Sequence, residues 1–340
     1  MGNNLSKLLK KRNMSTGNIE LDSFEKSKES IVVNGSNALC WFKFDDGRVL
    51  FKEYDNDLEA YGEVLYSVVA NRYGVKCAKY DFASYKGKRG TISYDLAFGN
   101  DKVAIDGLTL FARYNLDKLP KIVRNSTSNF DVLEMFNKKY NNYRELMRVF
   151  NSRYPNDVDK LEAQLVKMFI LDVFFDHVDK NLYNLMIVTN QYGMNAEFYS
   201  IDNSRIACLY KGEEYITDAI TNLLTSDGSI VIEDYLRGGV HGYDVNIKGN
   251  DSSPCKDLID FYYNCDSKQR EEIVQFIKNL EIDSAIEDVS EVHYINPLVN
   301  SWIKAVFDSR KNFILKKFYH IKDDYKVEHK EKNFFLRASK

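Results

Sequence analysis

Proline, paired cysteines, long apolar runs and an excess of one charge are all scarce in this sequence of 340 residues. Only 4 prolines and 17 glycines are present, which excludes a collagenous or low-complexity protein. Lys and Arg number 47 against 50 Asp and Glu, so the chain lacks the positive field of a dedicated nucleic-acid binder. The 44% hydrophobic and 14% aromatic content supplies a buried core. We therefore expect a globular protein with no direct nucleic-acid partner.

The cysteines and the apolar segments exclude two further classes of protein. The five cysteines are widely spaced and include no CxxC pair, so neither a disulfide framework nor a zinc site is indicated. The longest apolar stretches, near residues 168–175, are interrupted by Asp172 and are too short to span a bilayer. No apolar segment typical of a signal peptide follows Met1. These absences predict a cytoplasmic protein.

The first residues allow one exception to that location. Met-Gly-Asn-Asn-Leu-Ser matches the N-myristoylation pattern, with Gly2 as the acceptor and Ser6 in place, and basic residues follow. One acyl chain plus a basic patch is sufficient for stable membrane attachment. Because the motif is short and requires a eukaryotic enzyme, we favour an ordinary polar start. Membrane association is expected only if Gly2 is acylated.

The order of predicted elements indicates a small lobe followed by a larger one. Residues 1–28 are polar and are predicted to form a flexible tail. Apolar runs between turn residues predict antiparallel strands at 31–33, 39–44, 48–54, 77–85 and 91–94, with a helix over 58–73. Helical spacing then predicts helices at 131–150, 157–175, 213–224, 257–263, 268–280 and 297–318, with a hairpin-like pair at 185–188 and 197–201. We predict an α+β, bilobal architecture with a small lobe over 29–100 and a mainly helical lobe over 101–340.

Residues 176–184 carry the most informative chemistry. A buried helix ends in a polar loop with two aspartates and two asparagines, after which a strand begins. A second strand then leads into Asp202-Asn203-Ser204. Phosphoryl transfer uses one Asp to orient the attacking hydroxyl, and an Asn with a second Asp to hold Mg²⁺, which prefers oxygen ligands. Asp and Asn are also common in turns, so the order of the elements, rather than the spacing alone, favours the functional interpretation.

These segments resemble those of the HipA-like serine/threonine kinases, a bacterial branch of the protein-kinase-like superfamily. The family's catalytic loop reads D-x-H-x-x-N, which the sequence DKNLYN from Asp179 to Asn184 resembles, and its metal-binding strand ends in D-N-G or similar, like the sequence IDNS at residues 201–204. The resemblance covers roughly residues 31–205. It implies a protein-kinase-like fold, ATP and Mg²⁺ as cofactors, Asp179 as the catalytic base, Asn184 as a metal ligand and Asp202 as the main Mg²⁺ ligand. Asn181 stands where the family has His, so the loop loses a ring but keeps a hydrogen-bonding group, and reduced activity stays open.

A second alignment of the catalytic loop is possible. Asp176 and Asn181 have the same five-residue separation as Asp179 and Asn184. The strand that should directly follow the metal-binding Asn begins at Leu185, which favours the alignment with Asn184. His177 is then predicted to be a loop or packing residue.

In the small lobe, Lys52 lies in a predicted strand between apolar neighbours. The superfamily uses such a Lys to contact the nucleotide phosphates and pairs it with a helix Glu. Glu63 lies in the following predicted helix and is our candidate partner, with Glu59 one turn earlier as the alternative. A Lys on an edge strand can also serve solubility alone, but the surrounding order of elements favours the nucleotide-binding interpretation.

Two further segments are candidates for nucleotide contact. The turn formed by Gly35, Ser36, Asn37 and Ala38 could cradle phosphate oxygens with its backbone N–H groups, although it matches neither G-x-G-x-x-G nor a Walker A pattern. Ser36 is also a candidate regulatory autophosphorylation site, since a phosphate there would repel ATP. Tyr94 lies in the predicted connection between the lobes, where backbone groups would contact adenine.

Together these observations predict an ATP- and Mg²⁺-dependent kinase that phosphorylates Ser or Thr of a protein substrate and also itself. Two alternatives stay open. One is a lipid kinase, because phosphatidylinositol kinases use a D-R-H-x-x-N loop and the Gly2 pattern would suit a membrane substrate. The other is a pseudokinase that acts as a binding or toxin–antitoxin module with an antitoxin-like partner, as Asn181 and the single-glycine turn suggest.

Overall fold

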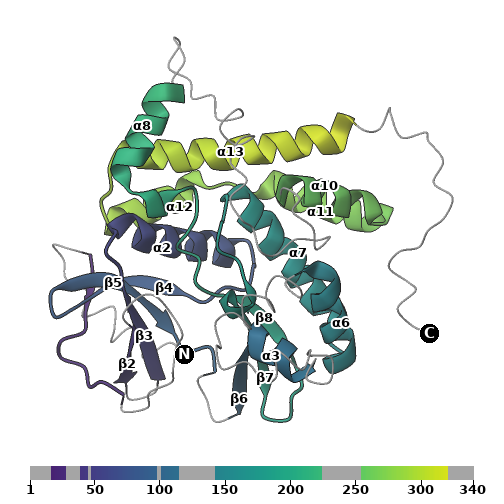
Figure 1. Cartoon of the computed structure of the whole chain (residues 1–340), viewed down its shortest axis with the longest axis horizontal. Helices are drawn as coiled ribbons and strands as arrows, with labels where there is room; N and C mark the ends of the chain where they lie inside the picture. Colours follow the sequence, from purple (N-terminus) through teal and green to yellow (C-terminus); the bar gives the residue numbers. More distant parts are fainter. Residues whose placement is uncertain are drawn as a thin grey trace, which may run out of the picture.

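The described helices and strands form two lobes in the computed structural model (Figure 1). One lobe is a five-stranded sheet with a covering helix, and the other is larger, mainly helical, and contains a three-stranded sheet. This is the bilobal α+β architecture that the sequence predicts. The structure describes residues 17–27, 39–44, 47–97, 101–114, 142–223 and 254–320.

The sheet of the small lobe places Lys52 on the face that the helix covers. Its strand order is β1-β4-β5-β3-β2. Successive side chains of a strand point to opposite faces, and Val49 and Phe51 belong to the buried cluster on one face. Lys52 therefore lies on the other face, opposite Thr91 of the neighbouring strand. The strands are β1 (Ile19–Glu20), β2 (Leu39–Phe44), β3 (Gly47–Glu53), β4 (Tyr80–Tyr85) and β5 (Lys88–Tyr94).

Residues 17–27 correct the prediction of a flexible tail over 1–28. β1 pairs in parallel with β4, and both Ile19 and Leu21 are fully buried. Gly17 has a φ of +69°, and a Cβ there would collide with the carbonyl oxygen of Val292 in the large lobe. The sequence pattern did not predict this strand, because two residues are too few to show the alternation of apolar and polar positions that marks a strand. This segment belongs to the sheet and contacts both lobes.

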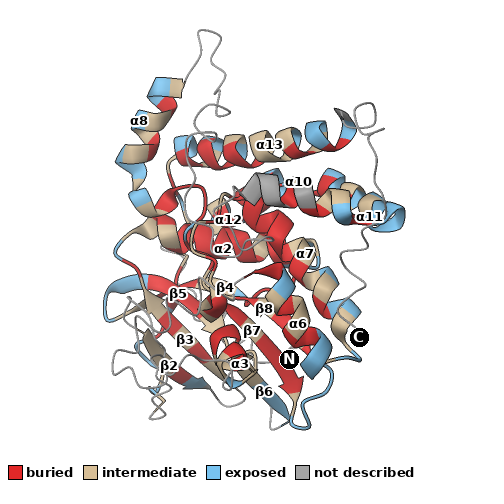
Figure 2. Ribbon diagram, turned by 45° about the vertical axis from the view of Figure 1, so that its right-hand side comes forward, coloured by how far each residue is buried: buried red, intermediate tan, exposed pale blue. Residues whose placement is uncertain are grey.

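Helix α2 (Asp57–Arg72) lies between the two lobes. It begins at Asn56, whose side chain accepts a hydrogen bond from the Leu58 N–H at 2.9 Å, as expected of an N-cap. The Tyr61 hydroxyl donates to Asn300 Oδ1 at 2.8 Å, and Arg72 pairs with Asp288 at 2.6 Å. Because α2 is buried on both sides (Figure 2), it is held by the sheet and by the large lobe at once.

The sequence analysis missed one strand and two helices of the large lobe, one of these helices being α3 (Gly107–Tyr114). Strand β6 (Lys102–Asp106) pairs with β7 (Leu185–Asn190), which pairs with β8 (Glu197–Ser200), all antiparallel. Helix α12 (Asp283–Val292) packs against α2. The remaining helices are α6 (Tyr143–Arg153), α7 (Val158–Phe174), α8 (Glu213–Leu223), α10 (Pro254–Asn264), α11 (Ser267–Asn279) and α13 (Pro297–His320), with the short helices η2 (Leu182–Asn184) and η3 (Leu209–Lys211).

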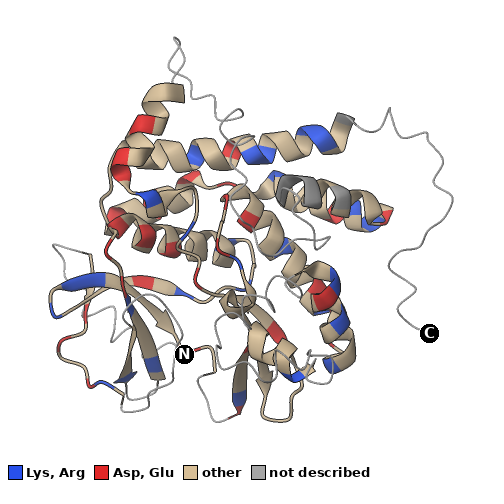
Figure 3. Ribbon diagram, viewed as in Figure 1, with Lys and Arg blue, Asp and Glu red and all other residues tan. Residues whose placement is uncertain are grey.

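Helix α7 forms the centre of the large lobe and ends where the polar loop begins. Phe174 and Phe175 pack edge-to-face on Phe307 of α13, with ring centroids 5.5 and 5.1 Å apart. Basic and acidic residues are interspersed along both lobes (Figure 3), in line with the balanced composition. In the part of the chain that is described, no helix combines the length and apolar character needed to cross a bilayer.

Candidate functional site

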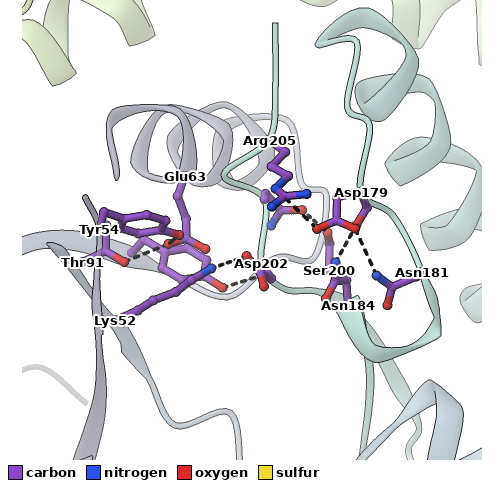
Figure 4. Close-up of polar contacts among 12 residues, drawn as sticks. Lys52, Tyr54, Glu63, Thr91, Asp179, Asn181, Asn184, Ser200, Asp202 and Arg205 are labelled. Atoms are coloured by element: carbon purple, nitrogen blue, oxygen red, sulfur yellow. Dashed lines mark hydrogen bonds and ion pairs between the residues drawn. The ribbon is translucent and has the colours of Figure 1, made fainter. Parts of the chain in front are cut away.

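The loop after α7 is shaped by its two asparagines. The Asn181 side chain accepts a hydrogen bond from the Tyr183 N–H at 2.9 Å and so starts the short helix η2. Asn184 ends η2, and its Nδ2 donates to the backbone oxygen of Asp179 at 2.5 Å. The Asn184 carbonyl accepts from the Ile201 N–H at 3.0 Å. The loop therefore closes on itself and lies beside the end of β8, as Figure 4 shows.

Asp179 presents its carboxylate at the open side of this loop. Its side chain is 37% exposed, and its Oδ2 lies 3.8 Å from Nε of Arg205. Asn181 Nδ2 donates to Asp179 Oδ1 at 3.3 Å. Burial raises the pKa of Asp179, and the positive charge of Arg205 opposes that rise. The result is an accessible carboxylate with a cation next to it.

Asp202 faces Lys52 across the boundary between the lobes. Lys52 Nζ donates to Asp202 Oδ1 in an ion pair that joins β3 of the small lobe to the segment after β8 (Figure 4). Asp202 has a φ of +53°, a left-handed conformation that Asp tolerates better than most residues. Its backbone N–H donates to the Tyr80 hydroxyl at 2.9 Å, which holds this turn against β4. The Asp202 side chain is 42% exposed and open to a ligand.

Glu63 lies beside Lys52 but does not form the predicted ion pair with it. Glu63 is fully buried on α2, and its Oε2 accepts from the Tyr54 hydroxyl at 2.6 Å and from Thr91 Oγ1 at 2.8 Å. Its Oε1 has no hydrogen-bond partner among the described residues. Burial raises the pKa of Glu63, and the nearby Lys52 opposes that rise. Lys52 Nζ is held by Asp202. Burial lowers the pKa of Lys52, but the negative charges of Glu63 and Asp202 outweigh it and leave the pKa raised, with a smaller contribution from Glu59.

The alternative alignment places Asp176 away from this group. Asp176 Oδ1 accepts from Arg310 Nη2 at 2.6 Å, and both side chains are 13% exposed. Asp176 is thus turned toward α13. The neighbouring His177 is buried and has its ring 6.1 Å from the Tyr66 ring, and burial lowers its pKa well below the usual value. These positions favour Asp179 over Asp176 as the residue that meets a substrate.

Sequence reasoning missed the buried side chains behind the loop. Lys180, next to Asp179, is fully buried and donates to Ser200 Oγ at 2.7 Å and to Asn203 Oδ1 at 2.5 Å. Its Nζ also lies 3.9 Å from Oδ1 of the buried Asp172 on α7. The network joins α7, the loop over residues 176–184, and β8 with the segment that follows it. A lysine in a polar loop gives no sequence signal of such burial, because lysine is almost always exposed.

Other predicted site residues lie elsewhere or outside the described chain. Gly35, Ser36, Asn37 and Ala38 fall outside the described residues, as do Gly2 and Ser6. Tyr94 is the last residue of β5, after which the chain passes toward β6 in the large lobe. Its backbone therefore lies at the connection between the lobes, and its contact with the nucleotide stays a prediction.

The oxygens at the end of β8 fit a magnesium ion. Asn184 Nδ2 donates to the Asp179 carbonyl, so Oδ1 is the atom with which Asn184 could ligate a metal. Mg²⁺ in phosphoryl-transfer sites takes one or two such groups and completes its shell with phosphates and water. The described residues contain no cluster of three or more His, Cys, Asp or Glu that could hold a metal ion.

Comparisons with known proteins define the fold. No protein-family model matches the sequence, and no curated protein is found as a relative. The proinflammatory kinase CtkA of Helicobacter pylori matches 89% of this chain over 97% of its own, with a TM-score of 0.65 and 11% identity. HipA of Shewanella oneidensis MR-1, from a toxin–antitoxin complex with HipB and operator DNA, matches 89% of this chain over 68% of its own, with a TM-score of 0.52 and 11% identity. The chain therefore has the fold of the HipA-like kinases, as its resemblance predicted.

Proposed function

From this kinase-like fold we propose that the protein is an ATP- and Mg²⁺-dependent kinase that phosphorylates Ser or Thr of a protein substrate. The observation that carries the proposal is the Lys52–Asp202 ion pair, which brings one residue from each lobe together beside Asp179 and Asn184. Phosphoryl transfer requires that the nucleotide and the acceptor be positioned and that the charge of the phosphates be neutralised. A lysine, two aspartates and an asparagine that lie together can meet both requirements.

Asp179 is suited to receive the proton of the acceptor. Its carboxylate is partly exposed and held by Asn181, so an incoming hydroxyl can reach it. In the proposed step, the hydroxyl oxygen bonds to the γ-phosphorus and its proton passes to Asp179. The bond from the γ-phosphorus to the bridging oxygen breaks, and its electron pair leaves with ADP. Mg²⁺ held by Asn184 and Asp202 would neutralise phosphate charge.

Lys52 is suited to exchange partners when nucleotide binds. Without a ligand its ammonium pairs with Asp202, the residue proposed to hold the metal. If Asp202 held the metal, Lys52 would be left to contact the phosphates. Glu63 is fixed in place by Tyr54 and Thr91, with its Oε1 unpartnered among the described residues, and can then hold the lysine.

Autophosphorylation and a protein partner belong to the proposal as well. The single-glycine turn with Ser36 supports the first by its place in the sequence alone. The second follows from the HipA neighbour, which was crystallised with HipB. For this chain we propose an antitoxin-like protein partner, with no direct contact to nucleic acid.

The test is transfer of labelled γ-phosphate from ATP by the wild type and by Asp202→Asn. Each protein is offered a soluble protein mixture and phosphatidylinositol vesicles with Mg²⁺. We expect label on Ser or Thr of protein, the enzyme included, and a loss on the order of 10²-fold or more in Asp202→Asn because the metal site loses its charge. Label on the vesicles would instead show a lipid kinase. ATP binding without transfer would show a pseudokinase.

A further inference from the structure

Arg205 is a cation at the site to which sequence reasoning gave no role. It follows Asp202 by three residues, and its backbone oxygen accepts a hydrogen bond from the Val178 N–H at 3.1 Å. A second hydrogen bond, from the Ala207 N–H to the Phe175 oxygen at 2.7 Å, also joins the segment after Asp202 to the segment after α7. The backbone of Arg205 is therefore fixed beside the catalytic loop.

The guanidinium of Arg205 is both near Asp179 and open to solvent. Its side chain is 47% exposed, and Nε lies 3.8 Å from Asp179 Oδ2, which is too long for a hydrogen bond. The guanidinium also lies over the Tyr210 ring, 5.8 Å from its centroid. Figure 4 shows the side chain directed toward Asp179. The donors of this fork can therefore bind an anion without first breaking a buried contact.

The position of the Arg205 charge relative to the proposed path of phosphoryl transfer indicates which ligand it could bind. In the proposed reaction, Lys52 and Asp202, which pair with each other, lie on the side of the leaving ADP, and Asp179, which lies near Arg205, is on the side of the attacking hydroxyl. The phosphoryl group in transfer lies between these two sides and carries negative charge on its equatorial oxygens. A guanidinium beside Asp179 matches those oxygens in charge and in planar geometry.

We propose that Arg205 binds the γ-phosphoryl group of ATP, as an arginine supplied in cis by the segment after the metal-binding strand. This inference rests on the proposed kinase function. It assigns Arg205 a ligand, the terminal phosphate, that ADP lacks. The ion pair with Asp179 is then the resting contact of a side chain that shifts to the phosphate when ATP binds.

The test compares binding of a non-hydrolysable ATP analogue and of ADP, both with Mg²⁺, by calorimetry. The proteins are the wild type, Arg205→Ala, Arg205→Lys and the control Lys211→Ala, which removes an exposed cation that lies 5.9 Å from the same Tyr210 ring. We expect Arg205→Ala to weaken the affinity for the ATP analogue roughly 10- to 100-fold and to change the affinity for ADP by no more than about twofold. Arg205→Lys should recover part of the loss, and Lys211→Ala should change neither affinity.

Three results would overturn the inference. If Arg205→Ala weakened the binding of both nucleotides equally, Arg205 would have a structural role. Thermal unfolding of the variant at a lower temperature than the wild type would show the same. An unchanged preference for the analogue, with a raised KM for the protein substrate, would mean that Arg205 binds an acidic residue of the acceptor instead. A wild type that binds neither nucleotide would overturn the proposed function itself.

Discussion

At the scale of single residues, burial distinguishes aspartates that the sequence alone makes equally good catalytic candidates. Four aspartates lie near the C-terminal end of α7 or in the two loops, and any of them could be catalytic by residue type. Two are committed to internal cations and little exposed, whereas the other two are 37% and 42% exposed beside each other's loops. The committed pair is Asp172 and Asp176, and the exposed pair is Asp179 and Asp202. Exposure, rather than sequence, thus marks the residues that can meet a ligand.

His177 makes a prediction at this scale. Its pKa is lowered well below the usual value because it is buried, so the native state stays neutral in mild acid. The unfolded chain takes up a proton below a pH of about 6.5. The contribution of His177 to the free energy of unfolding is therefore fully present above that pH. It is lost as the pH falls, by up to about 1.4 kcal/mol per pH unit.

The measurement is the free energy of unfolding in urea at about pH 7.5 and about pH 5.5, for the wild type and for His177→Phe. Because Phe does not titrate, the variant should lose less stability over this interval. An identical loss in both proteins would show that His177 does not set this pH dependence.

At the scale of elements, local pattern predicts hairpins and amphipathic helices well. The strand pair over 39–53, the helix α2 and the helix α7 lie within a few residues of their predicted limits. β1 and β6 were missed because pairing with distant strands, not local pattern, makes them strands. The order of the elements predicts which Asp and Asn residues the structure brings together around the loop. The contacts of Lys180 and Arg205 could not be predicted, because no sequence spacing records them.

The buried network around Lys180 gives a prediction for this scale. Lys180→Met removes the cation from beside Asp172, which is fully buried, and should lower stability by about 3–5 kcal/mol. Adding Asp172→Asn keeps an acceptor for the Tyr66 hydroxyl, which bonds Asp172 at 2.7 Å, and removes the uncompensated charge. The double variant should therefore recover stability, with a coupling of roughly 1–3 kcal/mol.

Urea unfolding of the two single variants and the double variant measures this coupling. Lys160→Met is the control, since Lys160 is 46% exposed in its pair with Glu197 and should matter by less than about 1 kcal/mol. Additive effects of the two buried changes would contradict the network.

At the scale of the whole molecule, the site exists only because both lobes are held together. α2 carries Glu63 and is bonded to the large lobe through Tyr61 and Arg72. Gly17 of the small lobe also approaches the backbone of Val292 on α12 closely. The Lys52–Asp202 ion pair then closes the site across 150 residues of sequence. None of these long-range contacts was predicted: the family resemblance implied only that Lys52 and Asp202 serve one nucleotide site, and nothing in the local sequence of either residue specifies the other.

The most direct test of the account is phosphoryl transfer from labelled ATP with Mg²⁺ by Asp179→Asn and Asp176→Asn. Each change removes one carboxylate of the same loop, and unfolding measurements identify the temperature at which both variants stay folded. The account predicts that Asp179→Asn loses transfer by about 10²-fold or more, whereas folded Asp176→Asn keeps it because Asp176 is turned toward Arg310. Transfer that persists in Asp179→Asn and disappears in Asp176→Asn would contradict it.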